Sequence, residues 1–173
     1  MPETALITRV PEAESYIARY RDRYDPSARR NVPAHVTILY PFMAPTLVDA
    51  HVLGRLRRVA GAVPGFSYRM ARTERFPVAL FLAPDPDAPF SALISGVFRE
   101  FPDYPPFEGK FDTIVPHITV AHGDEPLLCE IEVELRIALP GAGVPARCTE
   151  LVLIENSSGR WEQMDVFPLG AAQ

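Results

Sequence analysis

The stretch that decides the fold occurs twice, as Pro33-Ala-His-Val-Thr-Ile-Leu-Tyr-Pro-Phe42 and as Pro116-His-Ile-Thr-Val-Ala-His-Gly123. Both copies place a proline one or two residues before a histidine and continue with β-branched and apolar residues. Because side chains alternate across a strand, residues two apart share a face. Each copy therefore predicts a strand with a His and a Thr on one face and apolar side chains on the other.

The two His-x-Thr pairs, His35 with Thr37 and His117 with Thr119, are the candidate catalytic residues. A single His-x-Thr is a weak signal, since a chain with four histidines shows one easily by chance. Two copies in matched contexts, each behind a proline, are much harder to explain in this way. The alternative is that each histidine is only a half-buried imidazole on a strand, with the threonine present for its β propensity.

The segments around the two copies mix strands and helices. Strands are expected at Ala5–Val10, His35–Tyr40, Phe66–Phe76, Val78–Ala83 and Ile114–Ala121, and helices at Glu12–Tyr24, Leu47–Val63 and Phe90–Phe101. The segment Glu125–Ala138 reads as a short helix, although its apolar residues also alternate as in a strand. Asn156–Gly159, between two apolar runs, indicates a hairpin. We predict an α+β fold with two sheet-bearing lobes, and a single domain over residues 1–173.

The composition is that of an ordinary globular protein, with 47% hydrophobic and 23% charged residues. A net charge of −5 argues against a long electrostatic footprint on nucleic acid, but is compatible with a nucleotide or one RNA end. Cys129 and Cys148 are too few for a disulfide scaffold and lack metal-site spacing. The N-terminus has no signal-peptide pattern, and no apolar run is long enough for a membrane span. We expect a cytoplasmic protein without a membrane partner.

Two further groups of residues have weaker signals. Basic candidates for the rim of a phosphate-binding cleft are Arg29, Arg30, Arg72, Arg75 and Lys110. Each can equally be a solvated surface charge. His51 has no threonine companion and lies at helical spacing from Leu47, so we interpret it as a histidine on a helix surface.

The residue types of the paired motifs suit the cleavage or formation of a phosphodiester at a ribose. One proton has to be taken from the attacking oxygen, and another has to be given to the leaving oxygen. Histidine has its unperturbed pKa near neutrality, so two histidines can serve as base and acid. Threonine hydroxyls beside them can donate to the non-bridging phosphate oxygens, whose charge grows in the transition state. This chemistry requires no metal, and the sequence has no evident metal-binding motif.

The motifs His35-Val-Thr-Ile38 and His117-Ile-Thr-Val120 resemble the hallmark of the two-histidine (2H) phosphoesterase superfamily. The context His35–Phe42, the Pro-His-Ile-Thr core and the closing Leu151–Trp161 hairpin resemble its 2′-5′ RNA ligase-like branch. The resemblance implies a bilobal fold, in which two pseudo-symmetric lobes, each with an antiparallel sheet and flanking helices, surround a central cleft. It also implies chemistry on 2′,3′-cyclic phosphates or 2′-5′ linkages, without a metal or a cofactor.

The resemblance further implies roles for the paired residues. In the hydrolysis of a cyclic phosphate, His117 would activate the nucleophile and His35 would protonate the leaving oxygen. The roles would exchange in the reverse direction. Thr37 and Thr119 would hold the phosphate.

Two substrate-binding residues follow from the same resemblance. Tyr40 matches an aromatic position that stacks on a base in several members, with simple packing as the alternative. His122 matches a position where some members carry an arginine that faces the phosphate, so this departure removes a permanent charge. Strict alternation would put His122 on the core face of its strand, where it would have no role.

Three functions are open at this point. The first is a metal-independent phosphodiesterase acting on a 2′,3′-cyclic phosphate or 2′-5′ linkage of a nucleotide or short RNA end, with 2′-5′ ligation as its reverse reaction. The second is a binding module that retains the same ligand without turning it over. The third is a hydrolase of another cyclic phosphodiester metabolite. We expect the chain to be a monomer.

Overall fold

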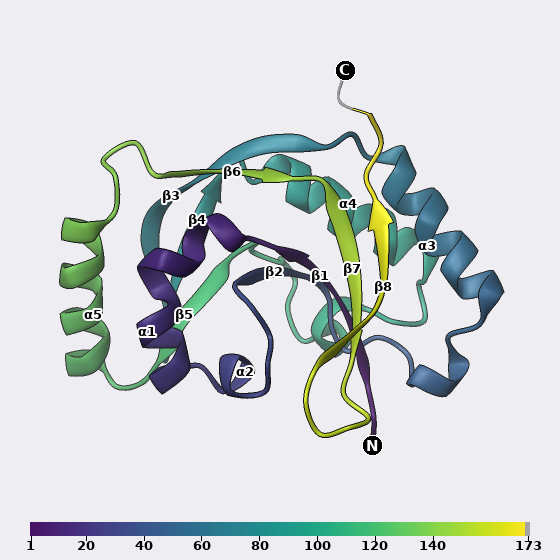
Figure 1. The fold of residues 1–173 in the computed structure, drawn as a ribbon, viewed down its shortest axis with the longest axis horizontal. Helices are drawn as coiled ribbons and strands as arrows, with labels where there is room; N and C mark the ends of the chain where they lie inside the picture. Colours follow the sequence, from purple (N-terminus) through teal and green to yellow (C-terminus); the bar gives the residue numbers. More distant parts are fainter. Residues whose placement is uncertain (172–173) are drawn as a thin grey trace.

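The structure is a computed structural model that describes residues 1–171, and it contains two antiparallel sheets of four strands each (Figure 1). The strands are β1 (Thr4–Arg9), β2 (His35–Leu39), β3 (Phe66–Phe76), β4 (Ala79–Asp85), β5 (Ile118–His122), β6 (Val144–Cys148), β7 (Glu150–Glu155) and β8 (Glu162–Pro168). The helices are α1 (Glu14–Tyr24), α2 (Pro26–Arg29), α3 (Ala50–Ala62), α4 (Ala88–Glu100) and α5 (Glu125–Ala138), with 3₁₀ turns at Pro11–Ala13, Pro45–Leu47 and Pro106–Gly109. The predicted α+β architecture with two sheets is confirmed.

Both strands that carry a motif lie at the edge of a sheet. The first sheet has the order β2-β1-β7-β8, and the second has the order β5-β4-β3-β6. Helices cross between the sheets: α1 packs against β5 with α5 beside it, whereas α4 packs against β2 with α3 beside it. In Figure 1, α1 and α5 lie on one side of the molecule and α3 lies on the other. This exchange joins the two sheets at their motif-bearing edges, where β2 and β5 contact one another.

The main hydrophobic core lies between the sheets and the helices. Val36 and Ile38 of β2, and Ile118 and Val120 of β5, are buried in it, as the alternation predicts. A smaller apolar cluster covers the other face of the first sheet and consists of Ala5, Ile7, Val32, Val152, Ile154 and Trp161. The central strands β1 and β7 are consequently buried on both faces.

The helix α5 resolves the ambiguous segment Glu125–Ala138. The side chain of Asp124 accepts a hydrogen bond from the backbone N–H of Leu127 at 3.1 Å, which caps the first turn. The buried residues of the helix follow a helical spacing: Leu128, Ile131 and Leu135. The segment is therefore a helix, and the strand-like alternation is incidental.

Three elements differ from the expectation. β5 begins at Ile118, four residues after the expected Ile114, because Pro116 has no N–H to donate to the sheet. The residues Pro26–Arg29 form a short helix beyond the predicted end of the first helix at Tyr24. The strand β6 contains Pro145 and is not signalled by the sequence, and it lies at a sheet edge, where a proline is tolerated.

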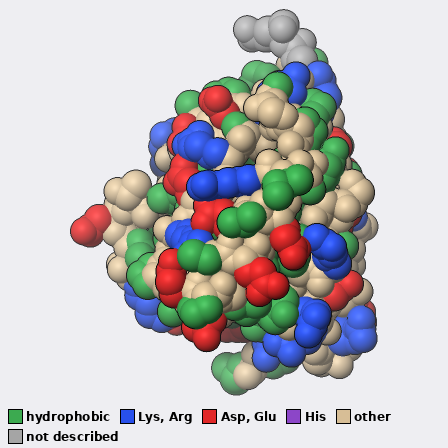
Figure 2. Space-filling view, turned by 90° about the vertical axis from the view of Figure 1, so that its left-hand side faces the viewer, with side chains coloured by type: hydrophobic (Ala, Val, Ile, Leu, Met, Phe, Trp, Pro, Cys, Tyr) green, Lys and Arg blue, Asp and Glu red, His purple; other side chains and the backbone are tan. Residues whose placement is uncertain are grey.

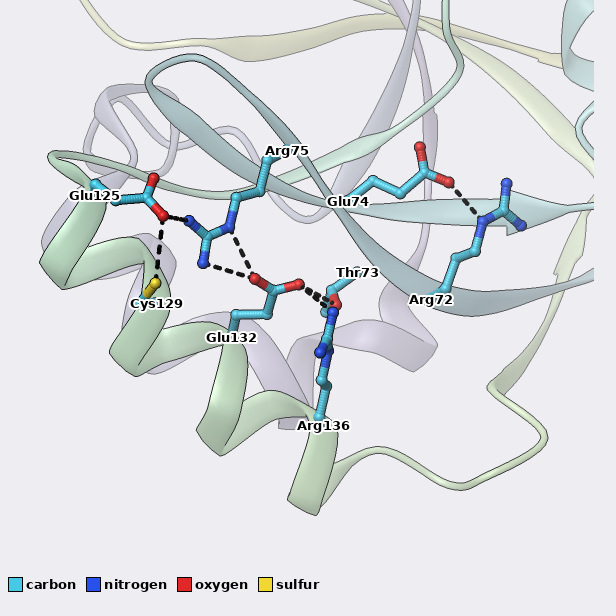
Figure 3. A network of polar contacts seen from close by, with 8 residues as sticks. All are labelled: Arg72, Thr73, Glu74, Arg75, Glu125, Cys129, Glu132 and Arg136. Atoms are coloured by element: carbon cyan, nitrogen blue, oxygen red, sulfur yellow. Dashed lines mark hydrogen bonds and ion pairs between the residues drawn. The ribbon is translucent and has the colours of Figure 1, made fainter.

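A polar network fastens α5 to β3 (Figure 3). Arg75 of β3 donates to Glu125 at 2.6 Å and to Glu132 at 2.8 Å, both on α5. The hydroxyl of Thr73 donates to Glu132 at 2.8 Å, and Arg136 donates to the same carboxylate at 2.7 Å. Arg75 is thus neutralised by α5, so it is not a free cation at a cleft rim.

The surface over α5 mixes charges of both signs. Figure 2 shows acidic and basic side chains interspersed on this face, without a broad area of one sign. Such a face does not provide the basic stripe with which proteins follow a nucleic-acid backbone. Across residues 1–171, no helix has the length and apolar character that a membrane crossing requires.

Candidate active site

Two edge strands bring the paired motifs together. His35 is the first residue of β2, and His117 directly precedes β5. β2 contacts β5, and the charge of His117 is among the groups that lower the pKa of His35. Thr37 and Thr119 are half-buried two residues further along each strand, on the faces of their histidines. The four residues predicted to be catalytic therefore lie together where the two sheets meet.

Both histidine rings are anchored in the same way. Nδ1 of His35 lies 2.8 Å from the carbonyl oxygen of Pro33, and Nδ1 of His117 lies 2.7 Å from that of Val115. A carbonyl oxygen can only accept a hydrogen bond, so Nδ1 carries the proton and donates it in each ring. Nε2 of each neutral ring therefore has a lone pair that can take a proton from a substrate.

The loop before the first histidine is held by α1. The guanidinium of Arg21, a buried side chain, donates to the carbonyl oxygen of Val32 at 3.0 Å and to the buried Asp25 at 3.0 Å. The backbone N–H of Ala34 donates to Glu14 at 2.6 Å. Because the buried charges are paired and hydrogen-bonded, they fix the backbone from which the histidine projects.

Two phenylalanines of the second sheet support the ring of His117. Phe76 meets it edge-on, with ring centroids 5.1 Å apart, and Phe81 lies 5.2 Å away at a tilt. The two phenylalanines stack on one another at 4.4 Å. The imidazole is thus oriented by a hydrogen bond at Nδ1 and by aromatic packing on its sides.

Burial lowers the pKa of both histidines. The pKa of His35 falls to about 4, chiefly because burial disfavours its charged form, and the nearby Arg21 and His117 lower it further. The hydrogen bond to Pro33 opposes this shift. Burial also lowers the pKa of His117, and His122 adds to the effect. Near neutral pH, both rings are therefore mainly in the neutral form that can accept a proton.

Each motif strand contains a β-bulge at the same place. The residue without a cross-strand partner is Ile38 in β2 and Val120 in β5, and each is the third residue after its histidine. A bulge shifts the alternation of side chains by one residue. The fifth residue after each histidine therefore returns to the face of that histidine.

These fifth residues are Tyr40 and His122. Tyr40 lines a cavity with His35, and His122 is exposed and lines a second cavity with His117. Strict alternation would put His122 on the core face, and this expectation is wrong because of the bulge at Val120.

The cavity on the His35 side has a volume of about 240 Å³. Its lining includes His35, Thr37, Tyr40, Trp161, Ile154 and Arg30. The rings of Tyr40 and Trp161 meet edge to face at 6.0 Å, and the Tyr40 hydroxyl donates to Glu3 at 2.8 Å. An apolar floor with a few polar groups at one end is typical of a small-molecule site. A larger cavity of about 630 Å³, around Arg9 and Arg147, includes neither histidine.

The family comparison agrees with this geometry. A family model described as the 2′-5′ RNA ligase superfamily matches residues 9–160, which contain both motifs and both bulges. The chain belongs to the 2′-5′ RNA ligase superfamily. The predicted resemblance to two-histidine phosphoesterases is thereby confirmed.

Similar proteins support this assignment to the superfamily. A curated protein of Bacillus pumilus (strain SAFR-032), named "Putative phosphoesterase", is 31% identical over 106 residues, which are 59% of this chain and 58% of that protein. Thus the chain spans just over half the length of this relative. The crystal structure of E. coli LigT complexed with 3′-AMP superposes with a TM-score of 0.63 at 19% identity, covering 98% of this chain and 99% of that one. TT0787 of Thermus thermophilus gives 0.64 at 16% identity, covering 99% and 100%. These two likenesses support the fold, in which helices flank two antiparallel sheets.

The structure adds residues that the superfamily motifs do not indicate. Trp161 follows the turn of the β7–β8 hairpin and reaches the first cavity, and its one sequence signal is that it is the sole tryptophan of the chain. Phe76 and Phe81 read in the sequence only as strand residues, because their contact with His117 depends on the pairing of β3, β4 and β5.

The remaining candidates have different positions. Arg30 lines the first cavity. Arg72 pairs with Glu74, and Lys110 pairs with Glu108. His51 is exposed on α3, as predicted. Within residues 1–171, no three His, Cys, Asp or Glu side chains are grouped so that they could hold a metal ion.

Proposed function

We propose that this superfamily member is a metal-independent phosphodiesterase that acts on a 2′,3′-cyclic phosphate or a 2′-5′ phosphodiester of a nucleotide or RNA end. The observation that carries the proposal is the matched anchoring of His35 and His117, which leaves Nε2 of both rings available in one site. One such nitrogen can remove a proton while the other, once protonated, supplies one.

The proposed hydrolysis of a cyclic phosphate has balanced proton transfers. Nε2 of His117 takes a proton from water, and the water oxygen forms a bond to phosphorus. The bond between phosphorus and one ribose oxygen breaks, and protonated His35 gives that oxygen its proton. His117 ends protonated and His35 ends neutral, so exchange with solvent restores the starting state. With a 5′-hydroxyl in place of water, the same steps form a 2′-5′ linkage.

The surroundings of the histidines support a nucleotide as the bound group. Thr37 and Thr119 stand two residues beyond the histidines, where their hydroxyls can donate to the non-bridging oxygens. Tyr40 and Trp161 give the first cavity an aromatic wall on which a base can stack. The structural neighbour from E. coli is described in complexes with 3′-AMP and with ATP, which agrees with this choice of ligand.

The proposal is tested with a panel of substrates in the presence of EDTA. The panel contains 2′,3′-cyclic nucleotides, 2′-5′ and 3′-5′ dinucleotides, and a cyclic phosphodiester that lacks a nucleobase. We expect turnover of the 2′,3′-cyclic nucleotides and the 2′-5′ dinucleotides in EDTA. Binding of every compound without turnover would make the chain a binding module. Preference for the compound without a base would make it a hydrolase of another metabolite, and loss of activity in EDTA would contradict the metal-independent step.

A further inference from the structure

A second cavity is lined by His117 and is separate from the one that Tyr40 lines. Its volume is about 440 Å³, and its lining includes Phe76, Phe107, Phe111, His117 and His122. The two cavities occupy corresponding positions relative to the two motifs. Each begins at a motif histidine, ends at the fifth residue beyond it, and lies on the face of the sheet that the histidine shares.

The lining of the second cavity is aromatic and apolar. Among the described residues that line it, none is a Lys, Arg, Asp or Glu, so the two histidines supply its titratable groups. Phe107 and Phe111 meet edge to face with centroids 5.7 Å apart. Phe111 is 61% exposed, so its ring is accessible to a ligand at the mouth of the cavity. A cavity of this size and lining suits a flat, uncharged ring system with one or two polar groups.

Phe107, which forms part of the wall of the second cavity, belongs to a loop that is hydrogen-bonded to the end of β2. Phe107 and Glu108 have positive φ values of 51° and 57°, a left-handed conformation that is unfavourable for residues with a side chain. The backbone N–H of Phe107 donates to the carbonyl oxygen of Tyr40 at 2.6 Å. A contact between the end of β2 and this loop thus holds the wall of the second cavity against the residue that lines the first.

We infer that the second cavity binds a nucleoside through its base. The 5′-hydroxyl of this nucleoside takes the place of water as the nucleophile. The inference rests on the proposed function, in which His117 activates the nucleophile and the cyclic phosphate belongs to the nucleoside in the first cavity. A nucleoside on the His117 side therefore presents its 5′-hydroxyl where water would otherwise stand. The site is then built for a linkage between two nucleosides, one in each cavity.

Cleavage of a 2′-5′ linkage uses the two histidines in exchanged roles. Nε2 of His35 takes the proton of the free ribose hydroxyl next to the 2′-5′ linkage, and that oxygen bonds to phosphorus. The bond from phosphorus to the 5′-oxygen breaks, and protonated His117 gives that oxygen its proton. The products are a 2′,3′-cyclic phosphate in the first cavity and a nucleoside with a 5′-hydroxyl in the second.

The experiment compares a substrate that would occupy both cavities with one that would occupy only the first. Adenylyl-(2′-5′)-adenosine would occupy both cavities, whereas adenosine 2′,3′-cyclic phosphate would occupy the first one. Both are assayed with the wild type, Phe111→Ala, Phe111→Tyr and Phe98→Ala. Phe98, which is 39% exposed on α4 and outside both cavities, provides a matched loss of a surface phenylalanine.

Stacking on an aromatic side chain sets the expected size of the effect. Phe111→Ala should reduce kcat/KM for the dinucleotide by about tenfold more than for the cyclic nucleotide, and Phe111→Tyr should restore most of the difference. Phe98→Ala should leave the ratio of the two activities unchanged. An equal effect of Phe111→Ala on both substrates would overturn the inference.

A binding measurement separates this inference from the proposed function. If the wild type turns over neither substrate, the proposed function fails, and isothermal titration with the intact dinucleotide decides the role of the cavity. Affinity about tenfold weaker in Phe111→Ala than in Phe98→Ala would retain the second nucleoside site in a binding protein. Equal affinities would reject it.

Discussion

Tyr40 and His122 occupy equivalent positions in the two lobes: each is the fifth residue after a motif histidine and faces the same cavity as that histidine. The equivalence depends on the bulges at Ile38 and Val120, which turn both residues out of the core. One lobe therefore presents an aromatic ring beside its histidine, and the other presents a titratable imidazole. This difference gives the two sides of the site different ligand preferences within one repeated framework.

The ring of Tyr40, more than its hydroxyl, should matter for binding. Tyr40→Phe loses the hydrogen bond to Glu3 and should reduce the free energy of unfolding by about 1 kcal/mol, with nucleotide affinity nearly retained. Tyr40→Ala also removes the stacking surface and should weaken nucleotide binding by about tenfold. Isothermal titration and urea unfolding of both variants test this, and equal affinity in the two variants would show that Tyr40 only packs.

The threonine hydroxyls should act on the transition state. Valine keeps the shape and β propensity of threonine, so Thr37→Val and Thr119→Val should fold normally and each reduce kcat by about 100-fold with little change in KM. Steady-state kinetics on a 2′,3′-cyclic nucleotide measure this. Thr46→Val, at an exposed threonine in the turn Pro45–Leu47, is the matched control. Variants that retain half of the wild-type kcat would exclude the proposed phosphate contacts.

The lowered pKa values of His35 and His117 determine the pH dependence. The reactive free enzyme has one proton on the pair, so it is most populated between two pKa values that both lie below about 6.5. We expect kcat/KM to be greatest on the acid side of about pH 6.5 and to fall as the pH rises above it. Bound phosphate favours the charged form of histidine and raises its pKa, so kcat should decline at a higher pH than kcat/KM. A kcat/KM maximum above about pH 7.5 would contradict this assignment.

The buried pair of Arg21 and Asp25 should support the fold. Arg21→Met leaves the Asp25 carboxylate buried without its partner and should reduce the free energy of unfolding by about 3–5 kcal/mol. Arg19→Met removes an exposed arginine of the same helix and should change stability by less than about 1 kcal/mol. Urea unfolding of both variants provides the comparison, and similar midpoints would show that the buried pair does not stabilise the loop before His35.

Local patterns in the sequence were sufficient for much of the fold. The alternation in His35–Leu39 predicts a strand with Val36 in the core, and the helical spacing in Phe90–Phe101 predicts α4, because both patterns depend on neighbours along the chain. The two His-x-Thr pairs could be found in the same way. Their repetition indicates that two strands present similar polar faces.

Features that depend on pairing between distant segments could not be predicted. The bulge at Val120 appears only when β5 is aligned with β4, so strict alternation gave the wrong face for His122. Trp161 reaches Tyr40 because the β7–β8 hairpin and β2 belong to the same sheet, in the order β2-β1-β7-β8, although the two residues are far apart in the sequence. The aromatic second cavity likewise combines the β3–β4 turn with the loop before β5.

The measurement that tests the central claim most directly is a mutant cycle on the two histidines, with His51→Ala as the control for loss of an exposed histidine. Hydrolysis of a 2′,3′-cyclic nucleotide in EDTA is compared for the wild type, His35→Ala, His117→Ala and the double variant. If the two rings act as one acid–base pair, each single variant should lower kcat by about 10²- to 10⁴-fold, and the double variant should be little worse than either. Turnover that survives either single substitution within about tenfold would contradict the two-histidine mechanism.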